Sequence, residues 1–298
     1  MLGSALMRSF DKNTGLSYFG FSRENGDLSR PDTLARVIED YRPDAVIHCA
    51  ARVGGIQANI ENQAYFLSEN LKIDSAVISS CLEKGITRFI QIGSSCMYPA
   101  DYRQPLLEAD MLKGPLETTN EGYALAKIVA SKLCEHYSKS LGVAYRTIIP
   151  SNLYGPGDNF ETKSSHLLAS VIRKVHEAKV YKRDEIEVWG SGEARREFTY
   201  VDDLADWISY SIFHLEDFPQ NLNVGYGVDY SVNEFYETAL EVIGVEARLV
   251  HDLTRPEGMK SKLMDSSVAR EGLGWNPKTD IKEGIFKTYN WFSSKLTD

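Results

Sequence analysis

Two serines and a cysteine stand together between Gly93 and Pro99, in the sequence Gly-Ser-Ser-Cys-Met-Tyr-Pro. The residues just before them, Arg-Phe-Ile-Gln-Ile, have the composition of a buried strand. Ligands of doubly wound parallel sheets bind beyond the carboxyl ends of the strands, where Ser94 and Cys96 would lie. Small, reactive side chains at this strand end therefore indicate a functional site.

A second pattern suggests the reaction. Tyr123 and Lys127 are four residues apart, so they share one face of a helix. A lysine ammonium near a phenol is expected to lower the pKa of Tyr123 and make it a proton donor and acceptor near neutrality. Tyr-x-x-x-Lys alone is a frequent chance pattern on exposed helices. With Ser94 able to hold a carbonyl oxygen against the phenol, the catalytic interpretation gains weight.

The elements that must position these groups alternate along the first half of the chain. Apolar, β-branched segments predict strands, and the segments between them have helical periodicity. We therefore predict an α/β fold, with a doubly wound parallel (Rossmann) sheet and a smaller mixed α/β substrate-binding lobe. We place the cofactor domain at 1–160 and the substrate lobe at 161–298, with about 195–230 returning to the Rossmann domain. The predicted strands are 16–21, 44–51, 88–95 and 145–155.

Composition narrows the class of protein. The chain has 298 residues, 43% of them apolar and 25% charged, which is ordinary for a globular protein. A net charge of -9 disfavours nucleic-acid binding. No membrane-spanning segment or secretory signal is visible, so we expect a cytoplasmic protein with no membrane partner. The four cysteines lack metal-site spacing, and no metal is expected.

Seven segments in a fixed order resemble the extended short-chain dehydrogenase/reductase family. Within it they resemble the epimerase/reductases that act on nucleotide-linked keto sugars. The segment 93–99 best distinguishes these epimerase/reductases from the related dehydratases, which usually have Thr-Asp-Glu there. The resemblance covers essentially the whole chain and is carried by residues 50–56, 93–99, 119–127, 151–160, 188–192, 195–203 and 223–229.

The resemblance implies conversion of GDP-4-keto-6-deoxy-D-mannose to GDP-L-fucose. The C4 ketone acidifies the protons at C3 and C5, and Cys96 and His166 are implied as the base and acid of the 3,5-epimerisation. NADPH then reduces C4, with Tyr123 protonating the C4 oxygen. Lys127 is implied to tune Tyr123 and hold the nicotinamide ribose, while Ser94 orients the ketone.

The expected cofactor is NADP(H). Arg23 follows the predicted strand 16–21, and an arginine at that strand end can bind a 2′-phosphate, although Glu24 beside it leaves NAD open. Similar sequences place Asp27 and Leu28 beside the adenine. The cofactor-binding residues implied in all are Gly3, Arg23, Asp27, Leu28, Ala50, Ala51, Ser94, Lys127, Pro150, Ser151, Asn152 and Leu153.

The resemblance also implies how the chain binds a GDP-sugar and how it assembles. Arg196 could neutralise the diphosphate. Lys174 stands where the family is expected to have arginine. Two helices of the parallel-sheet half are implied to pair between subunits, so a homodimer is expected. The substrate-binding residues implied are Lys174, Trp189, Arg196, Glu257 and Lys262.

The beginning of the chain departs from the family pattern. The resemblance implies a first strand and three glycines, of which only Gly3 matches the last. Without that strand, its two neighbours in the sheet would have unpaired backbone groups. We therefore expect Met1 to be an internal methionine of a longer chain.

Two other functions stay open. One is a C4-reductase or an epimerase that acts on another nucleotide-linked keto sugar, such as a GDP-deoxyheptose, although Cys96 and His166 are both present. The other is a non-catalytic nucleotide-binding relative, for which the missing glycines argue. NADPH oxidation with a keto sugar separates an enzyme from such a scaffold.

Overall fold

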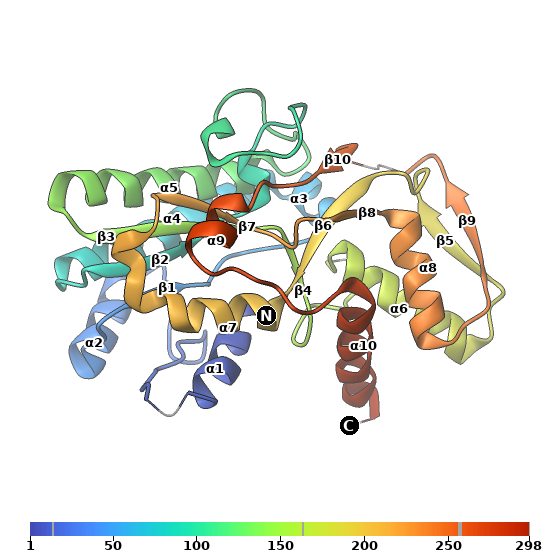
Figure 1. The fold of residues 1–298 in the computed structure, drawn as a ribbon, viewed down its shortest axis with the longest axis horizontal. Helices are drawn as coiled ribbons and strands as arrows, with labels where there is room; N and C mark the ends of the chain where they lie inside the picture. The colour runs from blue at the N-terminus through green and yellow to red at the C-terminus, as the bar shows by residue number, and fades with distance from the viewer. Residues whose placement is uncertain (14, 163, 256–257, 298) are drawn as a thin grey trace.

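The main sheet has four parallel strands and lies between two layers of helices (Figure 1). The computed structural model describes residues 1–13, 15–162, 164–255 and 258–297. The strand order is β1 (Val46–His48), β2 (Arg88–Ile92), β3 (Ala144–Pro150) and β7 (Asn221–Val224). Every neighbouring pair is parallel. The predicted Rossmann-type α/β fold is confirmed.

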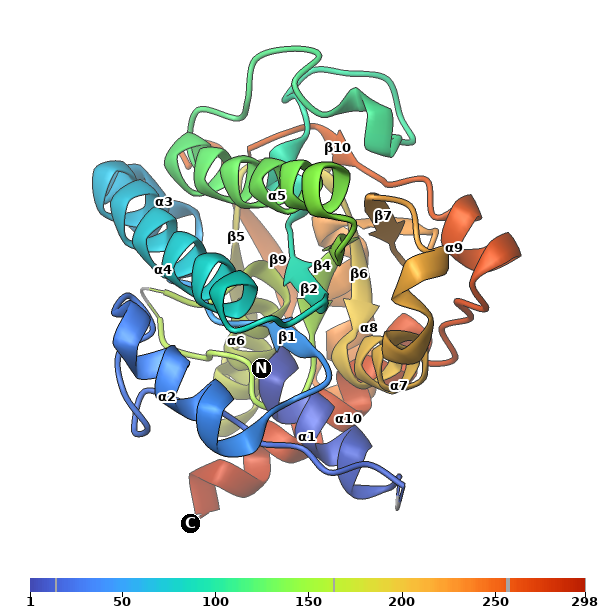
Figure 2. The ribbon, with the colours of Figure 1, turned by 90° about the vertical axis from the view of Figure 1, so that its left-hand side faces the viewer.

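Helices cover both faces of this sheet, as the doubly wound prediction requires (Figures 1 and 2). On one face lie α2 (Pro31–Tyr41), α4 (Gln63–Glu83) and α5 (Glu121–Leu141). On the other lie α1 (Leu2–Asp11), α7 (Val201–Ser211) and α9 (Ser267–Gly272). The two apolar cores that result fix the sheet, and with it the strand ends.

One predicted strand is wrong. Residues 16–21 have no strand conformation, and most of this segment is exposed. Among the described residues, β1 pairs with β2 alone and forms the sheet edge. A strand needs a hydrogen-bonding neighbour, and the segment 16–21 has none here. Alternating apolar residues alone are therefore not sufficient to form a strand. Of the predicted strand 44–51, only the three residues of β1 have strand conformation.

The second lobe is built on smaller sheets, at the right of Figure 1. One has the order β10 (Ser261–Lys262), β6 (Arg195–Tyr200), β4 (Asn152–Tyr154), with β8 (Asp229–Ser231) antiparallel to β6. The other pairs β5 (Glu185–Trp189) with β9 (Arg248–Asp252). They pack with α6 (Leu167–Tyr181), α8 (Val232–Ile243) and α10 (Ile281–Thr297). The predicted strand 145–155 is therefore two strands, one in each lobe.

Segments of the two lobes interleave along the chain. Helix α7 packs on α1, and β7 adds to the main sheet beside β3. The exact boundary at residue 160 stays a prediction. The remaining short elements are α3 (Ile56–Glu61), η1 (Ser95–Met97), η2 (Glu108–Asp110) and η3 (Ile212–Asp217). In the part of the chain that the structure describes, no helix is long and apolar enough to cross a membrane.

Candidate active site

The carboxyl end of β2 carries the first group of the site. After Ile92 the chain turns into the short helix η1, and Ser94 caps it, with its Oγ accepting a hydrogen bond from the Cys96 N–H at 3.3 Å. The Ser94 N–H lies 3.4 Å from the Met97 sulfur. Ser94 and Cys96 are both half-buried. The cap thus fixes hydroxyl and thiol next to each other at the sheet edge.

Helix α5 brings Tyr123 to the same place. Its half-buried phenol forms a hydrogen bond with Ser94 and interacts electrostatically with Cys96. The structure therefore brings together three of the predicted catalytic residues: Ser94, Cys96 and Tyr123. These groups come from two elements that lie far apart in the sequence.

The expected lowering of the Tyr123 pKa is not found. Burial of the phenol is the largest effect and raises its pKa, and the negative charges of Cys96 and Asp74 raise it further. The hydrogen bond with Ser94 opposes this without reversing it. The positive charge of Lys127 is offset by the Asp74 carboxylate that it contacts. Tyr123 is therefore a protonated phenol, the form that can donate a proton.

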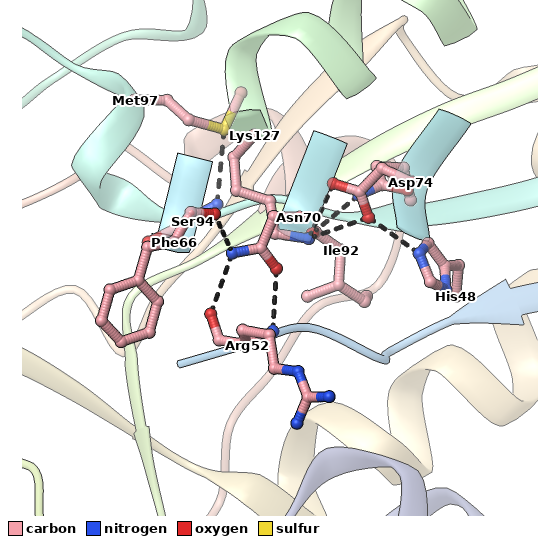
Figure 3. Close-up of polar contacts among 10 residues, drawn as sticks. His48, Arg52, Phe66, Asn70, Asp74, Ile92, Ser94, Met97 and Lys127 are labelled. Carbon is pink, nitrogen blue, oxygen red and sulfur yellow. Dashed lines mark hydrogen bonds and ion pairs between the residues drawn. The ribbon is translucent and has the colours of Figure 1, made fainter. Parts of the chain in front are cut away.

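Lys127 is buried, with 2% of its surface exposed, and is held from behind by helix α4 (Figure 3). Its Nζ lies 3.4 Å from both carboxylate oxygens of Asp74. His48, at the end of β1, lies with its Nε2 2.8 Å from Asp74 Oδ1. A buried ammonium needs such a counter-charge.

The Cys96 thiol lies between an amide and a guanidinium. Asn120 Nδ2 donates to the sulfur at 3.1 Å. Arg196 lies near Cys96 and Glu117, and burial lowers the pKa of this arginine while both groups act to raise it. The Asn120 Oδ1 atom is buried and has no hydrogen-bond partner in the part of the chain that the structure describes. An unpaired acceptor next to a thiol fits a site that binds a hydroxyl-bearing ligand.

His166 lies on a different loop. It is the residue just before α6, and the Ser164 carbonyl two residues before it accepts a hydrogen bond from the Gly55 N–H at 3.1 Å. His166 also lies near Asp158. Burial raises the pKa of Asp158, and the charge of His166 acts to lower it. The loop of His166 thus packs on the segment that follows β1, but it is not part of the Ser94, Cys96 and Tyr123 cluster.

The predicted cofactor residues surround the end of β1. Gly3, on α1, lies close to Cys49. The two residues after Cys49, Ala50 and Ala51, are half-buried. The next residue, Arg52, is fixed by Asn70, whose amide accepts from the Arg52 N–H at 2.8 Å and donates to its carbonyl at 3.0 Å (Figure 3). Arg52 Nε is buried and has no hydrogen-bond partner among the described residues. An unpaired guanidinium donor fits an anionic dinucleotide.

The loop before α2 departs from the prediction in one respect. Arg23 is exposed and does not follow a strand, because residues 16–21 are irregular. Asp27 accepts hydrogen bonds from the Ser29 N–H and hydroxyl, which hold the pKa of Asp27 below its usual value. Leu28 packs against the core between the sheet and α2.

The predicted nicotinamide segment joins the two lobes. Pro150 ends β3, and β4 begins at Asn152, followed by the half-buried Leu153. The Ser151 and Thr199 hydroxyls are 2.7 Å apart, and Asn152 Nδ2 donates to the Glu197 carbonyl at 3.1 Å. Both polar side chains therefore hold β4 against β6.

The predicted substrate residues form two groups. Arg196 and Lys262 are register partners on β6 and β10, so two cations stand side by side, and Arg196 lies near Cys96. Trp189 ends β5, with Lys174 Nζ 5.7 Å and the Arg255 guanidinium 5.0 Å from its ring centre. Lys174 also donates to the Glu187 carbonyl, and burial lowers its pKa. Glu257 lies outside the described residues.

Several polar residues of this region were not predicted. Asn70 and Asp74 lie one turn apart on the buried face of α4, and both are almost fully buried. A polar residue at an apolar position of a helix is the signal that would have identified them. Arg52 and Asn120 had no such signal, since nothing in their local sequence shows burial.

The Rossmann-type sheet and the serine, tyrosine and lysine at its carboxyl edge are the arrangement of the extended short-chain dehydrogenase/reductases. The family model described as "NAD dependent epimerase/dehydratase family" matches residues 1–225. The chain belongs to this family.

Individual relatives cover nearly the whole chain. It is 43% identical to the GDP-L-fucose synthase of Azorhizobium caulinodans over 89% of this chain and 85% of the relative. It is 40% identical to the GDP-L-colitose synthase of Yersinia pseudotuberculosis, over 98% and 94%. Among solved structures, the NADP-bound GDP-mannoheptose C4 reductase of Campylobacter jejuni superposes with a TM-score of 0.86 at 29% identity, over 98% and 95%.

Proposed function

We propose that this chain converts GDP-4-keto-6-deoxy-D-mannose to GDP-L-fucose by 3,5-epimerisation and NADPH-dependent reduction of the C4 ketone. The observation that supports this most is the cluster of thiol, hydroxyl and protonated phenol at the carboxyl end of β2. The names of the relatives that cover the chain point to the same substrate class.

Epimerisation needs a base and an acid on opposite faces of the sugar ring. In this proposal the Cys96 thiolate removes the proton at C3, and the electron pair of the C–H bond moves toward the C4 oxygen. Once Cys96 has released this proton to water and His166 has regained one from it, the same step is repeated at C5. His166 returns a proton to each carbon from the other face. Asn120 holds the sulfur in position at 3.1 Å, and the nearby Arg196 favours the anionic thiolate.

Reduction uses the phenol and hydroxyl of the same cluster. NADPH, when bound, supplies a hydride to C4. Ser94 holds the carbonyl oxygen, and Tyr123 donates its proton to that oxygen as the alcohol forms. The Lys127 ammonium lies on the same face of α5 and stabilises the phenolate left behind.

Binding is assigned to residues around this cluster. Arg196 and Lys262 would neutralise the diphosphate of the GDP-sugar, and Trp189 and Lys174 would contact another part of the nucleotide. Glu257 keeps its assignment as a prediction from sequence. For NADP(H) we propose Arg52 in addition to Gly3, Arg23, Asp27, Leu28, Ala50, Ala51, Ser94, Lys127, Pro150, Ser151, Asn152 and Leu153.

The test is NADPH oxidation with GDP-4-keto-6-deoxy-D-mannose, with the configuration at C3 and C5 of the product determined by NMR. The parent protein should consume NADPH and invert both carbons. Tyr123→Phe should lose about 10²–10⁴-fold in the reduction rate, as expected for loss of a general acid. Tyr137→Phe, on the same helix but outside the cluster, is the control. A parent protein that consumes no NADPH with this substrate contradicts the proposal.

A related substrate is the second candidate. The similarity to a GDP-L-colitose synthase and to a heptose C4 reductase favours it. GDP-linked keto-heptoses and other GDP-linked keto sugars should be assayed in parallel, and the highest kcat/KM identifies the substrate. If NADPH is consumed with none of these sugars, the result favours the alternative that the protein is a non-catalytic nucleotide-binding relative.

We also propose that the protein is a homodimer through α4 and α5. Leu125 and Val129 lie one turn apart on α5, and they are 36% and 50% exposed. Tyr65, on α4, is 49% exposed. Sedimentation equilibrium measures the oligomeric state, and a monomer at all concentrations would contradict the proposed homodimer.

The cytoplasmic location stays a prediction that cell fractionation can check.

A further inference from the structure

Three almost fully buried titratable groups lie behind the proposed proton donor. Asp74 and His48 are 2% and 3% exposed, and they connect to Lys127 in one line of contacts (Figure 3). Each residue comes from a different element: His48 from β1, Asp74 from α4 and Lys127 from α5. The function derived above uses Lys127 but gives Asp74 and His48 no role.

Burial of three such groups is costly unless they compensate each other. Moving a charged group from water into the protein interior is strongly unfavourable. An unpaired Lys127 ammonium would therefore not remain charged here. Burial alone would raise the pKa of Asp74, but Lys127 and His48 outweigh it and the pKa is lowered. Asp74 is therefore a carboxylate, and its charge balances that of Lys127.

The geometry of the pair leaves the ammonium available for other contacts. Both Lys127–Asp74 distances are 3.4 Å, longer than the 2.7–2.9 Å typical of strong charge-assisted hydrogen bonds. An ammonium has three N–H donors, and Asp74 takes at most two of them. At least one donor can therefore point to a ligand. His48 holds the carboxylate from the other side at 2.8 Å, which fixes its orientation.

Three other titratable groups face this pair. Tyr123 and Cys134 lie on α5, and the charge of Asp74 raises the pKa of both side chains. Cys49, which follows β1, feels the charge of Lys127, although burial raises its pKa to about 12. Of these groups, only Tyr123 belongs to the proposed reaction. The Asp74 carboxylate thus acts on the phenol in the sense opposite to the ammonium.

We propose that Asp74 is a positioning residue of this site: it holds the Lys127 ammonium in place behind Tyr123 and balances its charge, and His48 fixes the carboxylate in turn. The charge of Asp74 also adds to the burial that keeps the proton on Tyr123 until a substrate oxygen accepts it. This inference rests on the proposed role of Tyr123 as the proton donor of the reduction, and it adds the residues that position the lysine behind that donor.

The direct test measures the ionisation of Tyr123 itself. The protein is labelled with tyrosine carrying ¹³C at Cζ, and the Tyr123 resonance is assigned by its loss in Tyr123→Phe. A charge several ångströms away at an effective dielectric constant of about 20 shifts a pKa by about one unit. We expect Asp74→Asn to lower the pKa of Tyr123 by about this amount, and Asp74→Glu, which keeps the charge, to restore it. An unchanged Tyr123 pKa in a folded Asp74→Asn variant overturns the proposal.

A second pair of variants covers the case in which Asp74→Asn does not fold. Lys127→Met removes the ammonium, so Asp74→Asn added to it leaves no buried cation without a partner. In this background the added substitution isolates the charge of Asp74, and it should again lower the Tyr123 pKa by about one unit. Equal Tyr123 pKa values in Lys127→Met and in the double variant would overturn the proposal.

The pH dependence of NADPH oxidation gives an independent readout. A protonated Tyr123 is the active form, so the rate should fall at a lower pH in Asp74→Asn than in the parent. A purely structural role of Asp74 would lower the rate at all pH values without moving this limb. The NMR titration does not need turnover, so an inactive parent protein would contradict the proposed function while the test of Asp74 remained decisive.

Discussion

At the scale of single residues, the environment of Cys96 sets it apart from the other thiols. Cys81 and Cys134 are fully buried in an apolar core, where burial raises the pKa of each. Cys96 is half-buried and accepts a hydrogen bond from an amide, with a guanidinium nearby. A thiol in such a polar and partly open place is accessible to a substrate, whereas a thiol in an apolar core is not. Cys96 therefore stays the predicted base of the epimerisation.

The first prediction concerns this thiol. Cys96→Ser should abolish inversion at C3 and C5, since a hydroxyl is far less acidic than a thiol, while NADPH oxidation continues. Loss of a general base corresponds to about 10²–10⁴-fold in rate. The measurement is deuterium uptake at C3 and C5 in D₂O, followed by NMR, beside NADPH consumption.

Cys134→Ala is the matched control for this experiment. It removes a thiol from the buried face of α5 and should leave both rates unchanged. Deuterium uptake in Cys96→Ser at the parent rate would show that another residue is the base.

At the scale of elements, the end of β7 approaches β6 closely. Gly225 follows β7, and a Cβ at this position would overlap the Glu197 carboxyl group on β6. The Gly225 N–H donates to Ser266 Oγ at 2.8 Å, and its carbonyl accepts from Trp275 Nε1 at 2.7 Å. The glycine therefore cannot move away without breaking these bonds. Close packing of the main sheet against the second lobe depends on the missing side chain.

We predict that Gly225→Ala lowers the free energy of unfolding by about 1–3 kcal/mol, the usual cost of an added group in a packed core. Urea unfolding followed by circular dichroism measures it. Gly272→Ala is the control, because no atom lies within 4 Å of the Cβ it would add. If Gly225→Ala unfolds at the same urea concentration as the parent, β7 and β6 are less tightly packed than the structure indicates.

Elements also show what sequence alone could and could not predict. Helical periodicity predicted α2, α4 and α5 correctly, because their apolar faces are set by residues within each helix. The strand 16–21 was predicted wrongly, because a strand depends on a neighbour that its own residues do not specify. In the site, the spacing of Tyr123 and Lys127 was enough to predict that they share one face of a helix. The contacts with Asp74 and His48 were not, because they join elements far apart in the chain.

At the scale of the whole molecule, one buried carboxyl group connects the segments that form the two lobes. Glu197 is 1% exposed, and it accepts hydrogen bonds from the Gly227 N–H at 2.7 Å and the Met264 N–H at 3.1 Å. Burial raises its pKa to about 7, and Asp229 contributes to this, whereas the two N–H groups and Arg270 oppose it. Glu197 therefore titrates near neutral pH, between β6, which carries Arg196, and the segment that follows β7.

The final prediction follows from this pKa and its sign. The pKa of Glu197 is raised in the folded protein above its usual value, so its contribution to stability is present below about pH 4.5 and is lost as the pH rises through about 7. The free energy of unfolding should therefore fall between pH 5 and pH 8, by about 2 kcal/mol from this group. Glu197→Gln should remove that part of the slope in urea unfolding, since an amide does not titrate. The exposed Glu246→Gln should keep the parent slope, so the difference between the two variants isolates the contribution of the buried carboxyl group. Equal slopes in the parent and Glu197→Gln would mean that Glu197 is ionised throughout this range, stabilised by its two N–H donors more than its burial costs.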